Sequence, residues 1–147
     1  MTRTQMRENT FKLLFCKEFH DKEDMDEQFR LYLDDFEKVT DGESEIFSDE
    51  DREFISEDEK QYITERVNKV IELTQELDEK INEVSVGWKT DRMGKVELTI
   101  LRLAYFEMNY DEEVPKKVAI DQAVELAKKY GSDTAPGFVN GILAKLF

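Results

Sequence analysis

The chain has 147 residues, of which 39% are hydrophobic and 38% charged, and its formal net charge is -14. So acidic a surface repels phosphate, which argues against broad nucleic-acid binding and suits a basic protein partner. The only cysteine, Cys16, excludes an intramolecular disulfide and a cysteine metal cluster. No run approaches the roughly 20 apolar residues that span a bilayer, and we expect a cytoplasmic protein.

Apolar residues recur at steps of three and four along most of the chain, which is the period of amphipathic helices. No sustained alternation predicts a sheet, so we expect an all-α fold. Each stripe is far more typical of a core than of a binding site. The stripes in the first half are Phe11, Leu14, Phe15 and Phe19; Met25, Phe29, Tyr32, Phe36 and Val39; and Ile63, Val67, Val70, Leu77, Ile81 and Val84, which only Thr74 interrupts.

An acidic segment covers residues 41–60. It holds ten acidic and two basic residues, a net charge of -8, which is more than half of the charge of the whole chain. A block of like charges repels itself, so we expect a solvated loop here.

The second half opens with residues 96–108, which leave little polar surface on any side and predict a helix buried among its neighbours. Pro115 suits the start of the next helix, and Gly131 suits its end through a left-handed conformation. Thr134 is a candidate N-cap for the last helix, with Pro136 in the first turn. We place a boundary near Gly87, between an N-terminal helical subdomain (1–85, with the acidic loop) and a C-terminal one (86–147).

Basic residues gather locally despite the acidic total. Arg3 and Arg7 are four residues apart and would share a helix face, where they could contact phosphate. Lys117 stands at a predicted helix start, where backbone N–H groups also favour anions. Surface charges at such spacings are more often simply solvated, and that alternative stays open.

The residues offer little for catalysis. A nucleophilic site would have to use Cys16 and the only histidine, His20, and no group nearby would stabilise an oxyanion. The six glycines are scattered and form no phosphate-binding loop, and no Cys/His set could hold a metal. We expect no catalytic residue, no metal and no cofactor.

The order of residues in the C-terminal half resembles the bacterial NusB family, most specifically between Val96 and Leu143. The stretches that carry the resemblance are Val114–Gly131, Phe138–Leu143, Trp88, Arg92, Ile100–Glu107, Arg7–Glu8, Leu14 and Phe15. The resemblance implies two packed small helical bundles with about seven helices. It also implies a transcription antitermination factor that binds the boxA element of ribosomal RNA leader transcripts together with the ribosomal protein NusE. NusA, NusG and RNA polymerase would complete that assembly.

The same resemblance assigns candidate site residues by position. Thr4 and Gln5 stand where many family members have arginine, so the basic N-terminal edge is thinner here. The alternative is a helical protein-binding adaptor in ribosomal RNA processing or ribosome assembly, with weak RNA specificity. The RNA-binding candidates are Arg3, Arg7, Lys117, Tyr130, Thr134 and Phe138, and the candidates that face NusE are Phe15, Asp91 and Glu97. For Phe138, core packing is an equally good interpretation.

Overall fold

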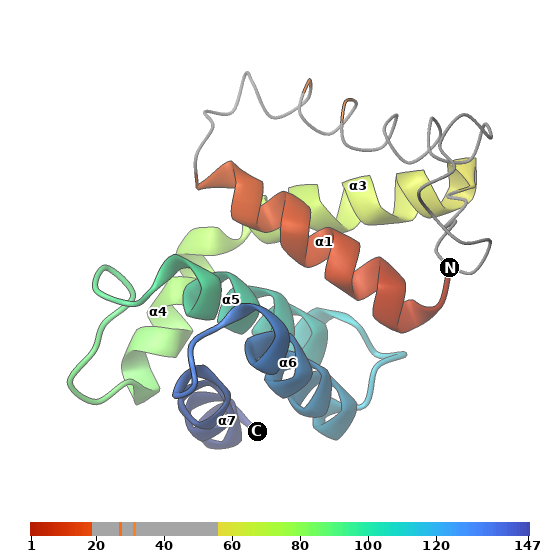
Figure 1. The fold of residues 1–147 in the computed structure, drawn as a ribbon. Coiled ribbons are helices and arrows are strands. Elements are labelled where there is room, and N and C mark those ends of the chain that lie inside the picture. Colours follow the sequence, from red (N-terminus) through yellow and green to blue (C-terminus); the bar gives the residue numbers. More distant parts are fainter. Residues whose placement is uncertain (19–26, 28–30, 32–55) are drawn as a thin grey trace. The chain divides into compact units, whose positions relative to one another are not determined.

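The computed structural model describes residues 1–18, 27, 31 and 56–147. The described part of the chain contains six helices and no strand, which confirms the predicted all-α fold; the expected count was about seven. The helices are α1 (Arg3–Lys17), α3 (Glu57–Glu72), α4 (Thr74–Val84), α5 (Lys95–Tyr110), α6 (Lys116–Tyr130) and α7 (Ala135–Leu146) (Figure 1). None of these helices is long and apolar enough to cross a membrane.

Parts of the sequence predictions lie outside the described residues. These are the stripe from Met25 to Val39, Phe19, His20 and residues 41–55 of the predicted acidic loop. The end of that predicted loop is described, and there the prediction was wrong. Residues 57–60 form the first turn of α3, where three acidic side chains favour the positive end of the helix dipole.

The chain divides into two compact units, Met1–Val67 and Asn68–Phe147. The boundary predicted from the sequence, between residues 85 and 86, falls inside the second unit and stays a prediction.

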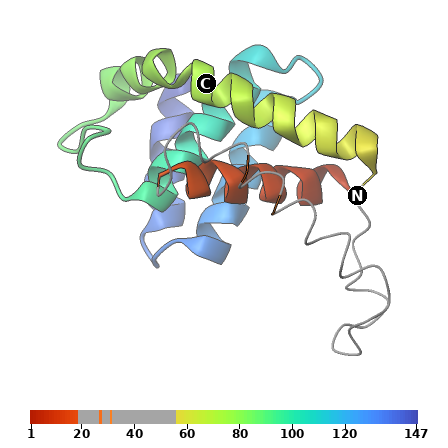
Figure 2. The ribbon, with the colours of Figure 1, turned by 90° about the horizontal axis from the view of Figure 1, so that it is seen from above.

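In the described part of the first unit, α1 and α3 each begin with a reciprocal cap. The Gln5 amide donates to Thr2 Oγ1 at 3.1 Å, and the Thr2 amide donates to Gln5 Oε1 at 2.7 Å. At the start of α3 the Ser56 amide donates to Glu59 Oε1 at 3.1 Å, and the Glu59 amide donates to Ser56 Oγ at 3.2 Å. The second carboxylate oxygen of Glu59, Oε2, lies 2.7 Å from the Met1 ammonium group. The helices α1 and α3 therefore begin at the same end of this unit (Figure 2).

The predicted stripe from Ile63 to Val84 is divided between two helices. α3 ends at Glu72 and α4 begins at Thr74, with Leu73 between them at φ -92° and ψ 4°. The Thr74 hydroxyl donates to the Val70 carbonyl oxygen at 3.0 Å, a side-chain hydrogen bond that competes with the backbone ladder and bends helices. Thr74, the polar residue that interrupts the apolar stripe, therefore marks the break between α3 and α4.

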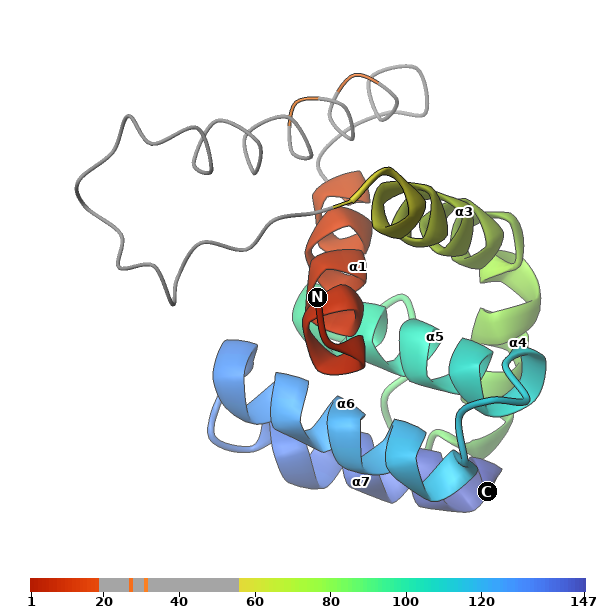
Figure 3. The same ribbon diagram turned by 90° about the vertical axis from the view of Figure 1, so that its right-hand side faces the viewer.

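The second unit is organised around α5, which contacts α4, α6 and α7 (Figure 3). This confirms the buried helix predicted over residues 96–108. Arg102 and Asp78 form a two-point ion pair between α5 and α4, with Nε–Oδ1 at 2.7 Å and Nη2–Oδ2 at 2.8 Å. The buried apolar side chains of α5 are Leu98, Ile100, Leu101, Leu103, Ala104, Phe106 and Met108.

Gly131 ends α6, as predicted, but for a different reason. Its backbone is extended, at φ -96° and ψ 179°, so the predicted left-handed conformation was wrong. A Cβ at this position would lie 2.5 Å from the Ala135 Cβ and 2.8 Å from the Ala127 carbonyl oxygen. The glycine is needed because α6 and α7 approach each other closely here.

Replacing Gly131 by alanine should destabilise the protein by about 1 to 3 kcal/mol, because the added methyl overpacks the corner between α6 and α7. Gly141→Ala is the matched control, since Gly141 lies within α7 and a Cβ there would meet nothing within 4 Å. It should stabilise by about 0.5 to 1 kcal/mol. Urea unfolding measures both changes, and equal effects of the two variants would contradict this packing argument.

Glu59→Gln should destabilise the chain that begins at Met1 without an added tag. The Met1 ammonium group and the Ser56 amide hold the pKa of Glu59 below its ordinary value of 4.5. The stabilisation is therefore full at pH values above 4.5 and is lost as the pH falls through the lower folded-state pKa. Thermal melts at several pH values should show the two chains converging in acid. Asp58→Asn removes only an interaction with the same helix dipole and should show a smaller convergence.

Candidate functional site

A shallow groove in the second unit is formed where the α4–α5 loop meets the first turns of α5 and α7. It has a volume of about 360 Å³. Three residues predicted from the sequence come together in it, namely Glu97, Thr134 and Phe138. The full lining is Trp88, Arg92, Met93, Gly94, Glu97, Thr134, Ala135 and Phe138.

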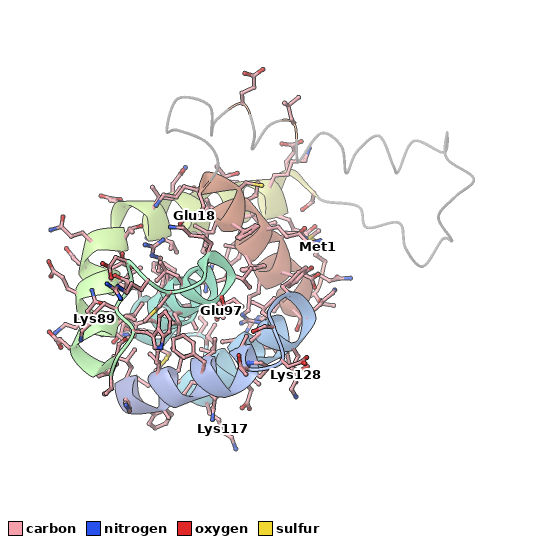
Figure 4. The ribbon with its side chains drawn as sticks, turned by 60° about the vertical axis from the view of Figure 1, so that its left-hand side comes forward. Met1, Glu18, Lys89, Glu97, Lys117 and Lys128 are labelled. Carbon is pink, nitrogen blue, oxygen red and sulfur yellow. The ribbon has the colours of Figure 1, made fainter. Side chains whose placement is uncertain are left out.

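The α4–α5 loop is held in place by polar contacts with the end of α4. The Thr90 amide donates to Asn82 Oδ1 at 2.8 Å, and Asn82 Nδ2 donates to the Thr90 hydroxyl at 3.1 Å. The Lys89 ammonium group, labelled in Figure 4, donates to the carbonyl oxygens of Asn82 at 2.8 Å and Ser85 at 3.0 Å. A cation at the negative end of a helix is favourable. These contacts fix the loop that carries Trp88.

The first turn of α5 places Glu97 in the groove (Figure 4). Gly94 occupies the N-cap position, and the Glu97 carboxylate, three residues later, lies close over it. A Cβ on Gly94 would overlap Oε2 of Glu97, so the glycine leaves room for the carboxylate. Glu97 thus stands at the positive end of α5, a position that favours a negative charge.

Thr134 occupies the N-cap position of α7, as predicted, but its side chain makes no capping hydrogen bond. Its hydroxyl lies 3.3 Å from the Ser132 hydroxyl and is exposed beside the groove. Phe138, one turn further along α7, is half-buried. Its ring therefore packs against the protein and also lines the groove, and its role in RNA binding stays a prediction.

The groove offers a mixed chemistry. Trp88 is 59% exposed and, with Phe138, supplies aromatic surface on which unpaired bases can stack. Arg92 carries a positive charge suited to phosphate, and Glu97 a negative charge suited to a basic side chain. The lining therefore offers contacts for an unpaired base, a phosphate and a basic side chain.

The other candidates of the second unit lie outside this lining. Lys117 is exposed in the first turn of α6, and its side chain extends away from the helices (Figure 4). Tyr130 ends α6 and is half-buried, with the Lys129 ammonium group 5.5 Å from the centre of its ring. Asp91 is exposed on the α4–α5 loop, next to Arg92.

Three candidates lie in the first unit, on α1. Arg3 is exposed, whereas Arg7 is only 9% exposed, so the two do not present an equal basic face. Phe15 is half-buried and stacks on Phe11, with ring centroids 6.2 Å apart. Burial raises the pKa of the Cys16 thiol, which makes it less reactive, and His20 lies outside the described residues.

Two lining residues, Trp88 and Arg92, were used from the sequence only to support the family resemblance. The sequence signal that could have found Trp88 is the glycine before it, Gly87, which interrupts the helical pattern. In the structure, Gly87 adopts a positive φ of 85°. Among the described residues, no three or more His, Cys, Asp or Glu side chains are grouped so that they could hold a metal ion.

Comparisons with known proteins agree with one another. The sequence matches the NusB family over residues 4–147. It is 48% identical to the transcription antitermination protein NusB of Agathobacter rectalis, over 99% of this chain and 98% of that one, and 44% identical to the protein of the same name from Lachnoclostridium phytofermentans, over the same shares.

Solved structures give the same fold. The structure of T. maritima NusB is 29% identical, with a TM-score of 0.75 over 99% of this chain and 90% of that one. A structure of the antitermination factors NusB and NusE in complex with dsRNA is 22% identical and has a TM-score of 0.75, over 99% of this chain and 97% of that one. With its matching sequence and fold, the chain belongs to the NusB family.

Proposed function

We propose that this chain is a transcription antitermination factor that binds boxA RNA of ribosomal RNA leader transcripts together with the ribosomal protein NusE. The relatives matched over nearly the whole chain are named as antitermination proteins. The observation that carries the proposal is the groove between α5 and α7. Its lining combines the aromatic rings of Trp88 and Phe138, on which bases could stack, with Arg92 and the carboxylate of Glu97. The factor acts in the cytoplasm as part of an assembly with NusA, NusG and RNA polymerase, and it is not an enzyme.

Single-stranded RNA is bound through its bases and its phosphates. Phe138 stacks on an unpaired base, and Thr134, exposed at the same edge, donates or accepts a hydrogen bond. Tyr130 adds a second stacking surface, and the exposed Lys117 pairs with a phosphate. On α1, Arg3 and the small exposed part of Arg7 add positive charge. Because these cations are few, NusE supplies much of the affinity.

NusE binds through the acidic residues. Glu97 in the groove and Asp91 on the adjoining loop pair with basic side chains, and Phe15 adds apolar contact from α1. The net charge of -14 accelerates association with a basic protein.

An adaptor in ribosomal RNA processing or ribosome assembly is the second candidate function. The burial of Arg7 favours it, because Arg3 is then the only exposed arginine of the described chain N-terminal to Thr10. The two functions differ in one measurable respect. An adaptor would bind NusE while showing no preference for boxA RNA.

Phe138→Ala should weaken binding of boxA RNA to the complex with NusE by about 1 to 3 kcal/mol, the value of one stacked base. Fluorescence anisotropy with boxA RNA and a scrambled RNA, at several salt concentrations, measures this loss. Binding of the unaltered chain should also weaken steeply with salt, because phosphate contacts release counterions. Phe147→Ala, at the exposed C-terminal residue, is the control and should change little. If neither the chain nor its complex with NusE prefers boxA over the scrambled RNA, the antitermination proposal fails and the adaptor is favoured.

Glu97→Lys should weaken NusE binding at least about tenfold and lower its salt dependence, because the substitution places like charges together. Calorimetry with purified NusE at two salt concentrations measures both effects. Glu72→Lys changes the charge equally at an exposed position of α3 and should leave the affinity nearly unchanged. Equal losses in the two variants would point to net charge alone and against a specific role of Glu97.

A further inference from the structure

A second groove lies between α4 and the C-terminal end of α5, within the second unit. It has a volume of about 310 Å³ and shares no lining residue with the first groove. Buried Leu77 forms its floor, Tyr105 and Tyr110 of α5 form its aromatic side, and Glu76 and Glu79 of α4 form its rim. None of the residues assigned to RNA or NusE lines it. The proposed function therefore gives this groove no role.

The aromatic side of the second groove is ordered before anything binds. Tyr110 is 52% exposed, and its ring stacks on Phe106 with centroids 5.5 Å apart and planes at 18°. The Asn109 side chain donates to the Tyr105 carbonyl oxygen at 2.9 Å, so it is held on its own helix. An exposed aromatic ring that is already fixed loses little conformational entropy when a partner contacts it.

The charge around the second groove favours a cation. Glu76 and Glu79 are exposed, and no hydrogen bond or ion pair engages either carboxylate within the described part of the chain. The one basic lining residue, Lys80, lies 3.6 Å from Glu83. The C-terminal end of α5, at Tyr110, adds the partial negative charge of the helix dipole. Carboxylates, aromatic faces and a helix C-terminus thus all attract positive charge at one place.

We propose that this groove docks an arginine-bearing segment of a basic protein partner, separately from the residues assigned to RNA and NusE. A guanidinium group is planar, so it stacks on a tyrosine face and also pairs with a carboxylate through two hydrogen bonds. The volume is at the lower end of the range for ligand sites, which suits one long side chain and its flanking backbone. The acidic rim repels RNA.

Triarginine amide is a suitable probe of the full chain. Two-dimensional NMR should show saturable shifts in the resonances of Glu76, Glu79, Tyr105 and Tyr110. Tricitrulline amide, which has nearly the same shape but lacks the three guanidinium charges, should cause none of them. Spermidine, a cation without a planar group, should bind at least about fivefold more weakly, because it lacks the guanidinium stacking.

Variants of the lining should confirm the location. Tyr110→Ala, and separately Glu76→Gln/Glu79→Gln, should each weaken triarginine binding about fivefold to tenfold. Tyr110→Phe keeps the ring and should retain binding, which separates a lost contact from a folding defect. The matched controls are Tyr62→Ala, an exposed tyrosine of α3, and Asp121→Asn/Glu125→Gln, two exposed acids of α6; both should bind as the unaltered chain does.

Several results would overturn the inference: shifts spread evenly over the acidic surface, equal binding of spermidine, or binding that survives Tyr110→Ala. Shifts of the same resonances by boxA RNA would instead make the groove a nucleic-acid site. The groove variants should leave the boxA and NusE titrations unchanged. Failure of those titrations would remove the proposed function and leave this inference standing, and failure of the triarginine titration would do the reverse.

Discussion

The second unit depends on the burial of α5. A helix that is apolar on nearly every side is stable only when neighbours cover its apolar side chains, and α5 contacts α4, α6 and α7. The coverage leaves little freedom in where the neighbouring helices run, since interiors pack as densely as organic crystals. The Arg102–Asp78 pair adds a directional contact to this non-directional attraction, because two hydrogen bonds between α5 and α4 are satisfied in only one register.

The packing around α5 leaves one groove at each end of this helix. The first turn of α5 meets the first turn of α7 and the braced α4–α5 loop, and the last turns of α5 meet α4. The ends also differ electrically, because a helix is partly positive at its N-terminus and partly negative at its C-terminus. One central helix thus carries two grooves, and the partial charge of the helix end differs between them.

The sequence correctly predicted the features that depend on periodicity and residue order. The predictions failed for features that depend on contacts between residues far apart in the chain. The all-α fold, the burial of α5 and the family follow from such local patterns. The reason for Gly131 does not, because the close approach of Ala135 is visible only once α7 has packed. Nor does the burial of Arg7, since spacing places a side chain on a face without saying whether that face is covered. For the site, three of the predicted residues line one groove. Trp88 and Arg92 line it too, but from the sequence they served only as evidence for the family resemblance.

The position of Trp88 has a practical consequence. It is the only tryptophan of the chain, and it lines the groove assigned to RNA and NusE while remaining largely exposed. Its emission is therefore a built-in optical reporter of that groove. A stacked base would quench it, and a covering protein would shift it to shorter wavelength by excluding water. Occupancy of the site can thus be followed in the unlabelled protein, with no dye that might itself compete for the aromatic surface.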